Sequence, residues 1–455
     1  MPKSKVLIQV ISSGIMQEHV LMLGDSYVKL WKIPTNQNLT LRFGSFKQNV
    51  KVVPVPRYDG LRINQVLARK MGLISGSYIR MNYKQGINTL SMGPLISVLI
   101  SRDYPNMPDK PFGSITSFCK ELVDACQKQG AYVYFFTPDL IGSNTTQLQG
   151  WVYSDGWHRM TVPIADVINN RLTSRKLENK PSVQHFMKEV KSRYRTSIFN
   201  EKFLDKTEVF DALKSDAALL RYLPESHLLR NFSMLKTMCS RHQVVFLKPV
   251  RGSLGKGIIR IAKSPDNHYN VYYTTINGTR KQTFSSLHKL FSSISGKMKT
   301  TRYQIQQGLT LIENNKRPVD FRALVQKNDT GKWTVTSVVA RIAGDQHFVS
   351  NLARGGSLST VKEAVVKSVV SPQTKMDAQA KLHKAALEIA KGVDTHIPAH
   401  FGELGIDLAL DTNGRVWLLE VNSKPSKNDN TPLSDTKIRP SVKQMIQYAC
   451  FLSGF

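Results

Sequence analysis

Short runs in which apolar and polar residues alternate dominate the first hundred residues. Segments 49–55 and 77–83 show this period of two and are bounded by Gly and Asn residues, so both are predicted as β-strands. One helical pattern near 64–71 interrupts the strands, and Gly72 is placed as its C-terminal stop. Residues 1–105 are therefore predicted to form a small, barrel-like, β-rich module.

A proline-rich stretch at 103–113 is the best candidate for a linker, and helices and strands alternate after it, up to residue 198. Residues 114–129 place apolar side chains at helical spacing, and the run 131–136 is typical of a buried strand. A further strand near 166–169 precedes a helix that begins at Pro181. We therefore expect a small α/β domain over 112–198, with a parallel sheet.

Two alternating apolar runs near the end of the chain flank Asn413-Gly414, a dipeptide typical of a β-hairpin turn. With a two-residue loop, counting back along the strands places Asp407 opposite Glu420, and Asn422 lies two residues along the same face. The reverse face is then apolar, with the pairs Ile406–Val421, Leu408–Leu419 and Leu410–Trp417. A four-residue loop would keep this arrangement, whereas a three-residue loop would break it.

Two opposed carboxylates repel each other unless a cation or a proton lies between them. Magnesium suits Asp407, Glu420 and the amide of Asn422, because it takes few protein oxygens and completes its shell with water and phosphate. The alternative is a solvated sheet face on which both carboxylates pair with lysines.

A glycine-rich loop, residues 251–257, follows the predicted strand that ends in Lys248-Pro249, and a second strand follows the loop. Such a loop can fold over phosphates, because glycine lets backbone N–H groups approach closely. Two other phosphate motifs are excluded. Val250 and Gly257 break the Walker A pattern, and the glycine spacing and the following strand break the Rossmann pattern. The alternative is a plain hairpin turn.

The 455 residues suffice for two or three domains, and 63 Lys+Arg against 33 Asp+Glu give a formal charge of +30. This charge favours anionic partners, but the basic residues are interspersed and no nucleic-acid reading motif is present, so dedicated nucleic-acid binding ranks last. The four cysteines lack zinc or disulfide spacing. We expect a cytoplasmic protein without a signal peptide or membrane span.

Taken in order, these motifs resemble the ATP-grasp fold over roughly residues 200–430. More narrowly, nearly the whole chain resembles the YheC/YheD type, the endospore-coat-associated ATP-grasp proteins of spore-forming bacteria. The resemblance rests on Phe203–Lys206, Leu223–Ser226, Arg317–Arg322, Asn351–Gly356 and the Asp407…Glu420-Val421-Asn422 hairpin. It implies an α/β (α+β) protein, in which an ATP-grasp domain of two lobes at 199–455 follows the two smaller units.

The resemblance also implies roles for individual residues. Lys206 and Lys248 would contact the nucleotide phosphates, and Gly252, Ser253, Gly255 and Gly257 would form the flap over them. The segment with Gln306 and Gln307 would hold adenine through backbone groups, and it carries glutamines where many relatives have an acidic residue. Arg322, Arg341, Asn351 and Arg354 match positions that face the acceptor or the transferred phosphoryl group, and Asp407, Glu420 and Asn422 match magnesium ligands. The alternative for Arg322 and Arg341 is a surface salt bridge or an ordinary sheet-face cation.

Two hypotheses follow from the resemblance. In the first, the protein is an ATP- and Mg²⁺-dependent ligase that joins a carboxylate to an amine through an acylphosphate, on a peptide or cell-envelope component during sporulation. In the second, it is a spore-coat-associated nucleotide-binding or structural protein without turnover. The expected partners are ATP, an unknown carboxylate and amine pair and, in the second case, spore-coat proteins.

Overall fold

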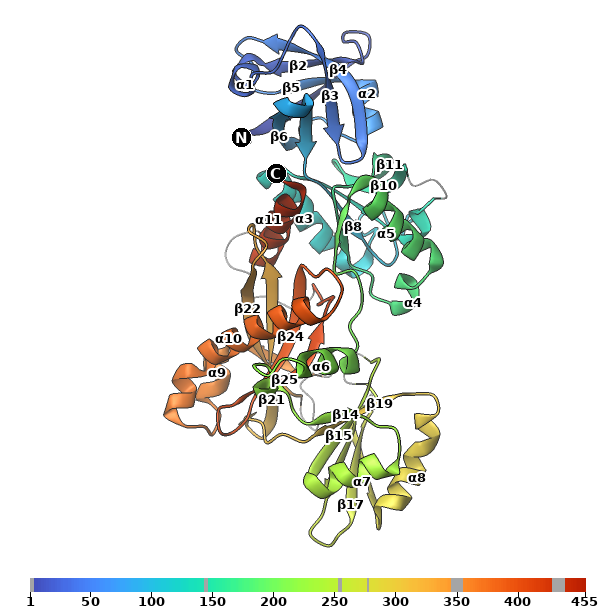
Figure 1. The fold of residues 1–455 in the computed structure, drawn as a ribbon, viewed down its shortest axis with the longest axis vertical. Coiled ribbons are helices and arrows are strands. Elements are labelled where there is room, and N and C mark those ends of the chain that lie inside the picture. Colours follow the sequence, from blue (N-terminus) through green and yellow to red (C-terminus); the bar gives the residue numbers. More distant parts are fainter. Residues whose placement is uncertain (1–3, 143–145, 253–255, 276–277, 345–354, 428–437) are drawn as a thin grey trace.

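A computed structural model describes residues 4–142, 146–252, 256–275, 278–344, 355–427 and 438–455. The chain forms a β-barrel, a middle α/β domain and two further lobes, which follow one another along the long axis of the molecule (Figure 1). We call the lobe built on residues 226–307 the N lobe, and the lobe built on β20 to β25 the C lobe. None of the described helices is long and apolar enough to cross a membrane.

The N-terminal module is a closed barrel, which confirms the barrel-like prediction. Its strand order is β1-β5-β2-β4-β3-β7-β6. The strands are β1 Ser4–Ile11, β2 Val20–Gly24, β3 Asn38–Phe43, β4 Phe46–Val55, β5 Leu61–Asn64, β6 Tyr78–Lys84 and β7 Thr89–Gly93. Two helices lie between strands, α1 Asp25–Trp31 and α2 Gln65–Met71. Helix α2 ends at Gly72 in the left-handed conformation (φ 64°), as its sequence predicts.

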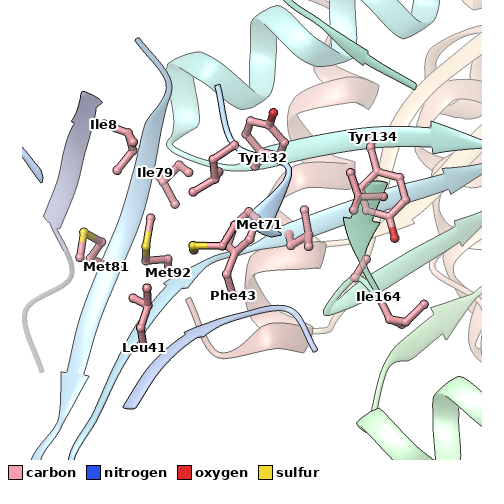
Figure 2. Packing of buried hydrophobic residues seen from close by; sticks show 14 of the residues in the cluster. Ile8, Leu41, Phe43, Met71, Ile79, Met81, Met92, Tyr132, Tyr134 and Ile164 are labelled. Atoms are coloured by element: carbon pink, nitrogen blue, oxygen red, sulfur yellow. The ribbon is translucent and has the colours of Figure 1, made fainter. Parts of the chain in front are cut away.

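The barrel shares its core with the middle domain. Figure 2 shows Leu41, Met81 and Met92 of the barrel on one side and Tyr134 on the other, with Phe43 and Tyr132 between them. The rings of Phe43 and Tyr132 meet edge to face, with their centroids 5.9 Å apart. The two units are therefore packed as one continuous apolar body.

The middle domain is built on a six-stranded sheet of order β11-β10-β9-β8-β12-β13, in which β8, β9, β12 and β13 run parallel. The strands are β8 Leu95–Leu99, β9 Tyr132–Phe136, β10 Gln147–Tyr153, β11 Trp157–Pro163, β12 Val167–Asn170 and β13 Ser197–Phe199. The helices are α3 Thr116–Gln129, α4 Arg175–Glu178, α5 Pro181–Tyr194 and α11 Pro440–Ser453. The predicted parallel sheet and the predicted helix at Pro181 are confirmed.

Two features cross the predicted boundaries at 105 and 199. Strand β8, which those boundaries leave with the barrel module, lies inside the middle sheet. Helix α11, from the far end of the chain, packs on α3, and its Val442 and Met445 belong to the apolar core of the middle domain. The predicted linker at 103–113 is wrong, because this stretch lies within the middle domain, where Asp103 Oδ2 accepts a hydrogen bond from Trp151 Nε1 (2.7 Å).

The N lobe is an antiparallel sheet of order β14-β19-β15-β16-β17-β18, covered on one face by two helices. Its strands are β14 Ser226–Leu228, β15 Val244–Pro249, β16 Ile259–Lys263, β17 Tyr269–Thr275, β18 Gly278–Phe284 and β19 Tyr303–Gln307. Its helices are α7 Phe232–Arg241 and α8 Leu287–Met298.

The C lobe is a second sheet, of order β23-β22-β21-β24-β25, with β20 beside β21. Its strands are β20 Glu313–Asn314, β21 Arg317–Lys327, β22 Trp333–Ile342, β23 Ser357–Ser359, β24 Glu403–Leu410 and β25 Val416–Asn422. Helices α6 Lys206–Lys214, α9 Val361–Val366 and α10 Pro372–His396 pack on it. Four 3₁₀ turns complete the described elements, at Gln85–Ile87, Gly113–Ile115, Pro138–Leu140 and Leu220–Tyr222.

The β24–β25 hairpin has the predicted polar face but a different turn. Asp411 N donates to Arg415 O (3.0 Å), so the loop has three residues and the predicted two-residue loop is wrong. The predicted pairs Leu408–Leu419 and Leu410–Trp417 are wrong as well, since Leu408 faces Leu418 and Leu410 faces Val416. A β-bulge adds one residue to β25 and restores the register, so that Asp407 still faces Glu420.

Candidate active site between the two lobes

Lys206 connects the C lobe to the loop that follows β15. Asp205 caps helix α6 by accepting a hydrogen bond from Glu208 N (2.8 Å), which makes Lys206 the first helical residue. Its Nζ atom lies 3.0 Å from Glu420 Oε1 and 3.4 Å from the carbonyl oxygen of Gly252. One ammonium group therefore bridges the hairpin carboxylate and the start of the glycine-rich loop.

Lys248 lies half-buried on β15, and its Nζ donates to Gln306 Oε1 on the neighbouring strand β19. Burial lowers the pKa of Lys248 to about 8, and the positive charge of Lys206 adds to this effect. A lysine in this state gains strongly from an anionic ligand, because a phosphate would restore the charge balance that the protein leaves incomplete.

Three buried polar atoms on the same sheet face have no protein partner within the described ranges. They are Gln304 Oε1, Gln306 Nε2 and Ser226 Oγ. Gln304 is the cross-strand partner of Lys248, and Gln306 accepts a hydrogen bond from it, while Ser226 is the cross-strand partner of Gln306 on the far side of β19. Buried polar groups are rarely left without a partner unless a ligand or water satisfies them. This face is thus suited to a ligand that can donate and accept hydrogen bonds.

Gln307, predicted beside Gln306 in the adenine segment, has a structural contact. Its Oε1 accepts a hydrogen bond from Glu225 N (2.7 Å), and its N–H donates to Glu225 O (2.9 Å). The side chain of Gln307 is therefore engaged with the β14 end of the lobe, which leaves Gln306 as the glutamine whose amide nitrogen is available.

The C lobe contributes a buried network of arginines and aspartates. Arg322 on β21 is the cross-strand partner of Asp407 and holds it through Nε and, at 3.2 Å, through Nη2. Arg341 on β22 holds Asp320 (Nε to Oδ1, 2.6 Å) and reaches Asp407 Oδ1 (3.1 Å). Burial opposes ionisation of Asp407, but Arg322 and Arg341 outweigh it and lower its pKa.

The residues available for magnesium are two carboxylates and one amide. Asp407 and Glu420 are direct cross-strand partners, and Asn422 is opposite Gly405 on the same face, two residues along. Over the described ranges, no three His, Cys, Asp or Glu side chains gather as a metal site. Oxygen donors of this number fit magnesium, which keeps water and phosphate in its shell. Both carboxylates already face protein cations, so the fit requires Lys206 to leave Glu420.

Several predicted site residues lie outside the described residues: Ser253, Gly255, Asn351 and Arg354. Gly252 and Gly257 are described. Gly257 has φ +71°, and a Cβ there would lie 3.2 Å from Pro249 Cγ, so the loop returns to β16 through a conformation that favours glycine. Six predicted site residues have polar contacts in the groups described above: Lys206, Lys248, Arg322, Arg341, Asp407 and Glu420.

The sequence did not single out Asp320 or the charged cluster beneath the hairpin. Asp320 lies two residues before Arg322 on one strand, so strand periodicity could have placed both on one face. The cluster holds the segment after Asn422: Lys424 pairs with Glu178, and Glu403 pairs with Lys427 and Arg171. These partners lie 24 to 246 residues apart, and no local pattern connects them.

Sequence comparisons match much of this chain to known proteins. Residues 195–452 match the family model described as YheC/D like ATP-grasp. The endospore coat-associated protein YheD of Bacillus subtilis is 29% identical over 75% of this chain and 74% of its own length. The protein YheC of the same organism is 24% identical, over 73% of this chain and 90% of its own length.

Two ligases are among the similar solved structures. The D-Ala:D-Ser ligase VanG of Enterococcus faecalis has a TM-score of 0.48, with 13% identity over 79% of this chain and 99% of its own. The D-alanyl-alanine synthetase A of Vibrio cholerae has a TM-score of 0.45, with 12% identity over 80% of this chain and 99% of its own. The family match covers more than half of the chain, and the chain accordingly belongs to the YheC/D-like ATP-grasp family.

Proposed function

We propose that this protein is an ATP- and Mg²⁺-dependent ligase that joins a carboxylate to an amine through an acylphosphate. The observation that carries the proposal is the convergence of Lys206, Lys248, Asp407 and Glu420 between the lobes, with Lys206 contacting both the hairpin and the glycine-rich loop. Cations for phosphates and oxygen donors for a hard metal ion are the groups that phosphoryl transfer requires.

Lys206 and Lys248 bind the nucleotide phosphates in this proposal. The phosphates draw Lys206 away from Glu420, which frees that carboxylate, together with Asp407 and Asn422, to hold magnesium. When bound, magnesium neutralises charge on the phosphoryl oxygens. The unpartnered amide of Gln306 and its neighbours Gln304 and Ser226 hold the base.

Arg322 and Arg341 orient the reacting groups. The substrate carboxylate oxygen forms a bond to the γ-phosphorus, the bond to the β-γ bridging oxygen breaks, and ADP leaves. The amine then forms the amide bond at the acyl carbon, phosphate leaves with the two electrons of the broken C–O bond, and the proton that the amine loses passes to the departing phosphate. Guanidinium groups suit both steps, because their planar fork can bind a carboxylate or an acylphosphate through two hydrogen bonds.

The relatives YheD and YheC are endospore coat-associated proteins, and this association extends the proposal to a cellular setting. We place the reaction in sporulation, on a peptide or cell-envelope component, by a protein that is cytoplasmic or associated with the spore coat. The excess of basic residues over the chain favours an acidic substrate or partner.

One observation favours a second candidate, a nucleotide-binding or structural protein without turnover. Both hairpin carboxylates are already paired with protein cations, Asp407 with two arginines and Glu420 with Lys206. If these pairs persist when nucleotide binds, the metal site does not form and the phosphates are bound without transfer.

The test is ADP release on incubation with ATP, Mg²⁺ and a panel of amino acids and acidic peptides, compared between the parent and Glu420→Gln. Glu420→Gln keeps the shape of the hairpin but removes one charge. We expect nucleotide affinity to change less than tenfold and turnover to fall at least a hundredfold, because the metal stabilises charge that develops in the transition state.

Glu388→Gln serves as the matched control, since Glu388 on α10 forms an ion pair with Arg221 and neither is a predicted site residue. Equal ADP release from the parent and Glu420→Gln would contradict the ligase and leave the second candidate. Absence of any melting shift with millimolar ATP and Mg²⁺ would contradict the ligase and the nucleotide-binding form of the second candidate, and would leave only a structural role.

A further inference from the structure

The N lobe carries a disproportionate share of the positive charge. Residues 226–308 include eight Lys and six Arg but only one acidic residue, Asp266, which amounts to +13 of the chain's +30. Asp266 pairs with His268 (3.0 Å), so it neutralises none of these lysines and arginines directly. A lobe with this excess of positive charge attracts anions to its surface.

Part of this charge is ordered on one face of the sheet. Strands β15 to β18 place Phe246, Arg260, Tyr272 and Lys281 in one cross-strand row. The opposite face carries Val245, Ile259 and Val271, which are buried under α7 and α8. The row is therefore on the uncovered face, the same face that carries Lys248 on β15.

Tyr272 holds the two cations of the row. The Arg260 guanidinium lies 5.0 Å from the centroid of its ring, and the Lys281 ammonium lies 5.9 Å from it. Both distances fit cation–π contacts, which restrict where long basic side chains point. The ring is thereby engaged with cations, whereas binding of single-stranded nucleic acid relies on aromatic faces on which bases stack.

Strand β18 is the edge of the sheet, and its residues 280–283 are exposed. An exposed edge offers backbone N–H and C=O groups with which an extended peptide can pair as an added strand. Nucleic acid lacks these matching groups. The combination of a basic row and an open edge thus favours an extended peptide with acidic side chains.

We propose that the surface formed by Arg260, Tyr272, Lys281 and the β18 edge docks an extended acidic peptide segment. Strands lie about 4.8 Å apart, so the three steps from β15 to β18 span roughly 15 Å. A segment paired with the β18 edge runs along that strand, beside Lys281, at the end of the row that is farthest from β15. If the protein is a ligase, this segment would belong to the substrate that bears the carboxylate, but docking itself requires no turnover.

The test measures binding of a fluorescent ten-residue glutamate peptide by anisotropy at low salt, without ATP. The variant Arg260→Glu/Lys281→Glu is compared with Lys236→Glu/Lys289→Glu, which makes the same charge change at exposed positions on α7 and α8. We expect the first pair to weaken binding by about tenfold or more and the second by less than about threefold. Lys281→Glu alone, at an exposed edge position, tests the proposal if the double variant is unstable.

Nucleotide affinity, measured separately, verifies the fold of each variant and separates failure of docking from failure of the proposed function. Equal losses in the two double variants would overturn the proposal, because they would indicate diffuse attraction to the whole lobe. Tighter binding of a single-stranded ten-nucleotide thymidine oligomer than of the peptide, lost in the same variant, would also overturn it in favour of nucleic acid.

Discussion

The sequence alone does not reveal the polar partners or the pKa values of individual side chains in the site. Lys248 and Lys206 are both predicted to contact the nucleotide phosphates, yet Lys206 is paired with Glu420, whereas Lys248 contacts a neutral amide. Burial and the charge of Lys206 lower the pKa of Lys248 to about 8. In the proposed phosphate binding, Lys206 would therefore exchange one anion for another, whereas Lys248 would gain a proton at any pH at which it starts out neutral.

Nucleotide binding is therefore expected to take up a proton through Lys248. In the unfolded chain this lysine holds its proton up to about pH 10.5, and in the free folded protein only to about pH 8. The protonated lysine therefore destabilises the folded protein, and the free energy of unfolding should rise as the pH rises from about 8 to about 10.5. Bound phosphate reverses the shift. At pH 8 about half a proton should be taken up for each nucleotide bound, and affinity should fall as the pH rises further.

Calorimetry in two buffers of different ionisation enthalpy measures this uptake. Lys248→Arg is the matched variant, because arginine keeps the charge but remains protonated throughout the range. Nucleotide binding to Lys248→Arg should show no proton uptake at this position. Equal uptake in Lys248→Arg and the parent would assign the proton to another group.

At the scale of elements, the polar face of the β24–β25 hairpin was predictable, but its turn was not. Period-two alternation placed Asp407 opposite Glu420 and Ile406 opposite Val421, and both pairs are present. The Asn-Gly dipeptide favoured a two-residue loop. The hydrogen bond from Asp411 N to Arg415 O closes a three-residue loop instead. The bulge in β25 compensates, because the buried side of the strand keeps its apolar residues inward only if the register is restored.

The contacts among the site's charges were less accessible to prediction. Pairing of Arg322 with Asp407 needs the knowledge that β21, and not another strand, lies beside β24. Such non-local pairing depends on the packing of helices α6 and α10 under the whole sheet. Sequence periodicity says which face a side chain occupies, and only the strand order says which side chains share that face.

Gly308 at the end of β19 is expected to be essential to the N-lobe sheet. Its N–H donates to Val244 O (2.7 Å), and an added Cβ would lie 2.6 Å from Val244 Cβ and 2.7 Å from Val244 O. Gly308→Ala must therefore separate β19 from β15, the strands that carry Gln306 and Lys248. We expect a loss of about 1–3 kcal/mol in unfolding free energy, with weaker nucleotide binding.

Gly296 on helix α8 is the matched control in the same lobe. It is exposed, and a Cβ added there would have no atom within 4 Å outside its own helix backbone and chain neighbours. Gly296→Ala should stabilise the protein by up to about 1 kcal/mol, because alanine is the better helix former. Chemical denaturation with nucleotide titration measures both variants, and a loss of similar size in the two would argue against a special role for Gly308.

At the scale of the molecule, the middle domain and the C lobe are joined beneath the candidate site. The segment that follows Asn422 is held by Lys424, whose Nζ pairs with Glu178, and by the carbonyl oxygen of Pro425, which accepts from Arg171 Nη2 (2.6 Å). Glu178 also accepts from Phe203 N (2.8 Å), three residues before Lys206. The Glu178 carboxylate thus connects the middle domain to the segment before Lys206 and to the segment after Asn422.

Glu178→Gln is expected to loosen this junction by leaving Lys424 charged and without its carboxylate. The side chains of Lys424 and Glu178 are 3% and 4% exposed, and loss of one partner of a buried pair costs about 3–5 kcal/mol at neutral pH. Burial already lowers the pKa of Lys424 to about 8, and loss of Glu178 lowers it further. Because the lysine is neutral above that pH in the fold, the difference in stability between variant and parent should shrink from pH 6 to pH 9.

Chemical denaturation of the parent and Glu178→Gln at both pH values measures this change. Glu388→Gln is the control, because its partner Arg221 remains charged over the whole range, so its smaller cost should be the same at pH 6 and pH 9. Nucleotide affinity with magnesium should fall in Glu178→Gln as well, since Lys206 and Asn422 both adjoin segments that this carboxylate anchors. If Glu178→Gln lost the same stability at pH 6 and at pH 9, the cost would arise from lost hydrogen bonds to Asn170 and Phe203 rather than from the buried charge of Lys424.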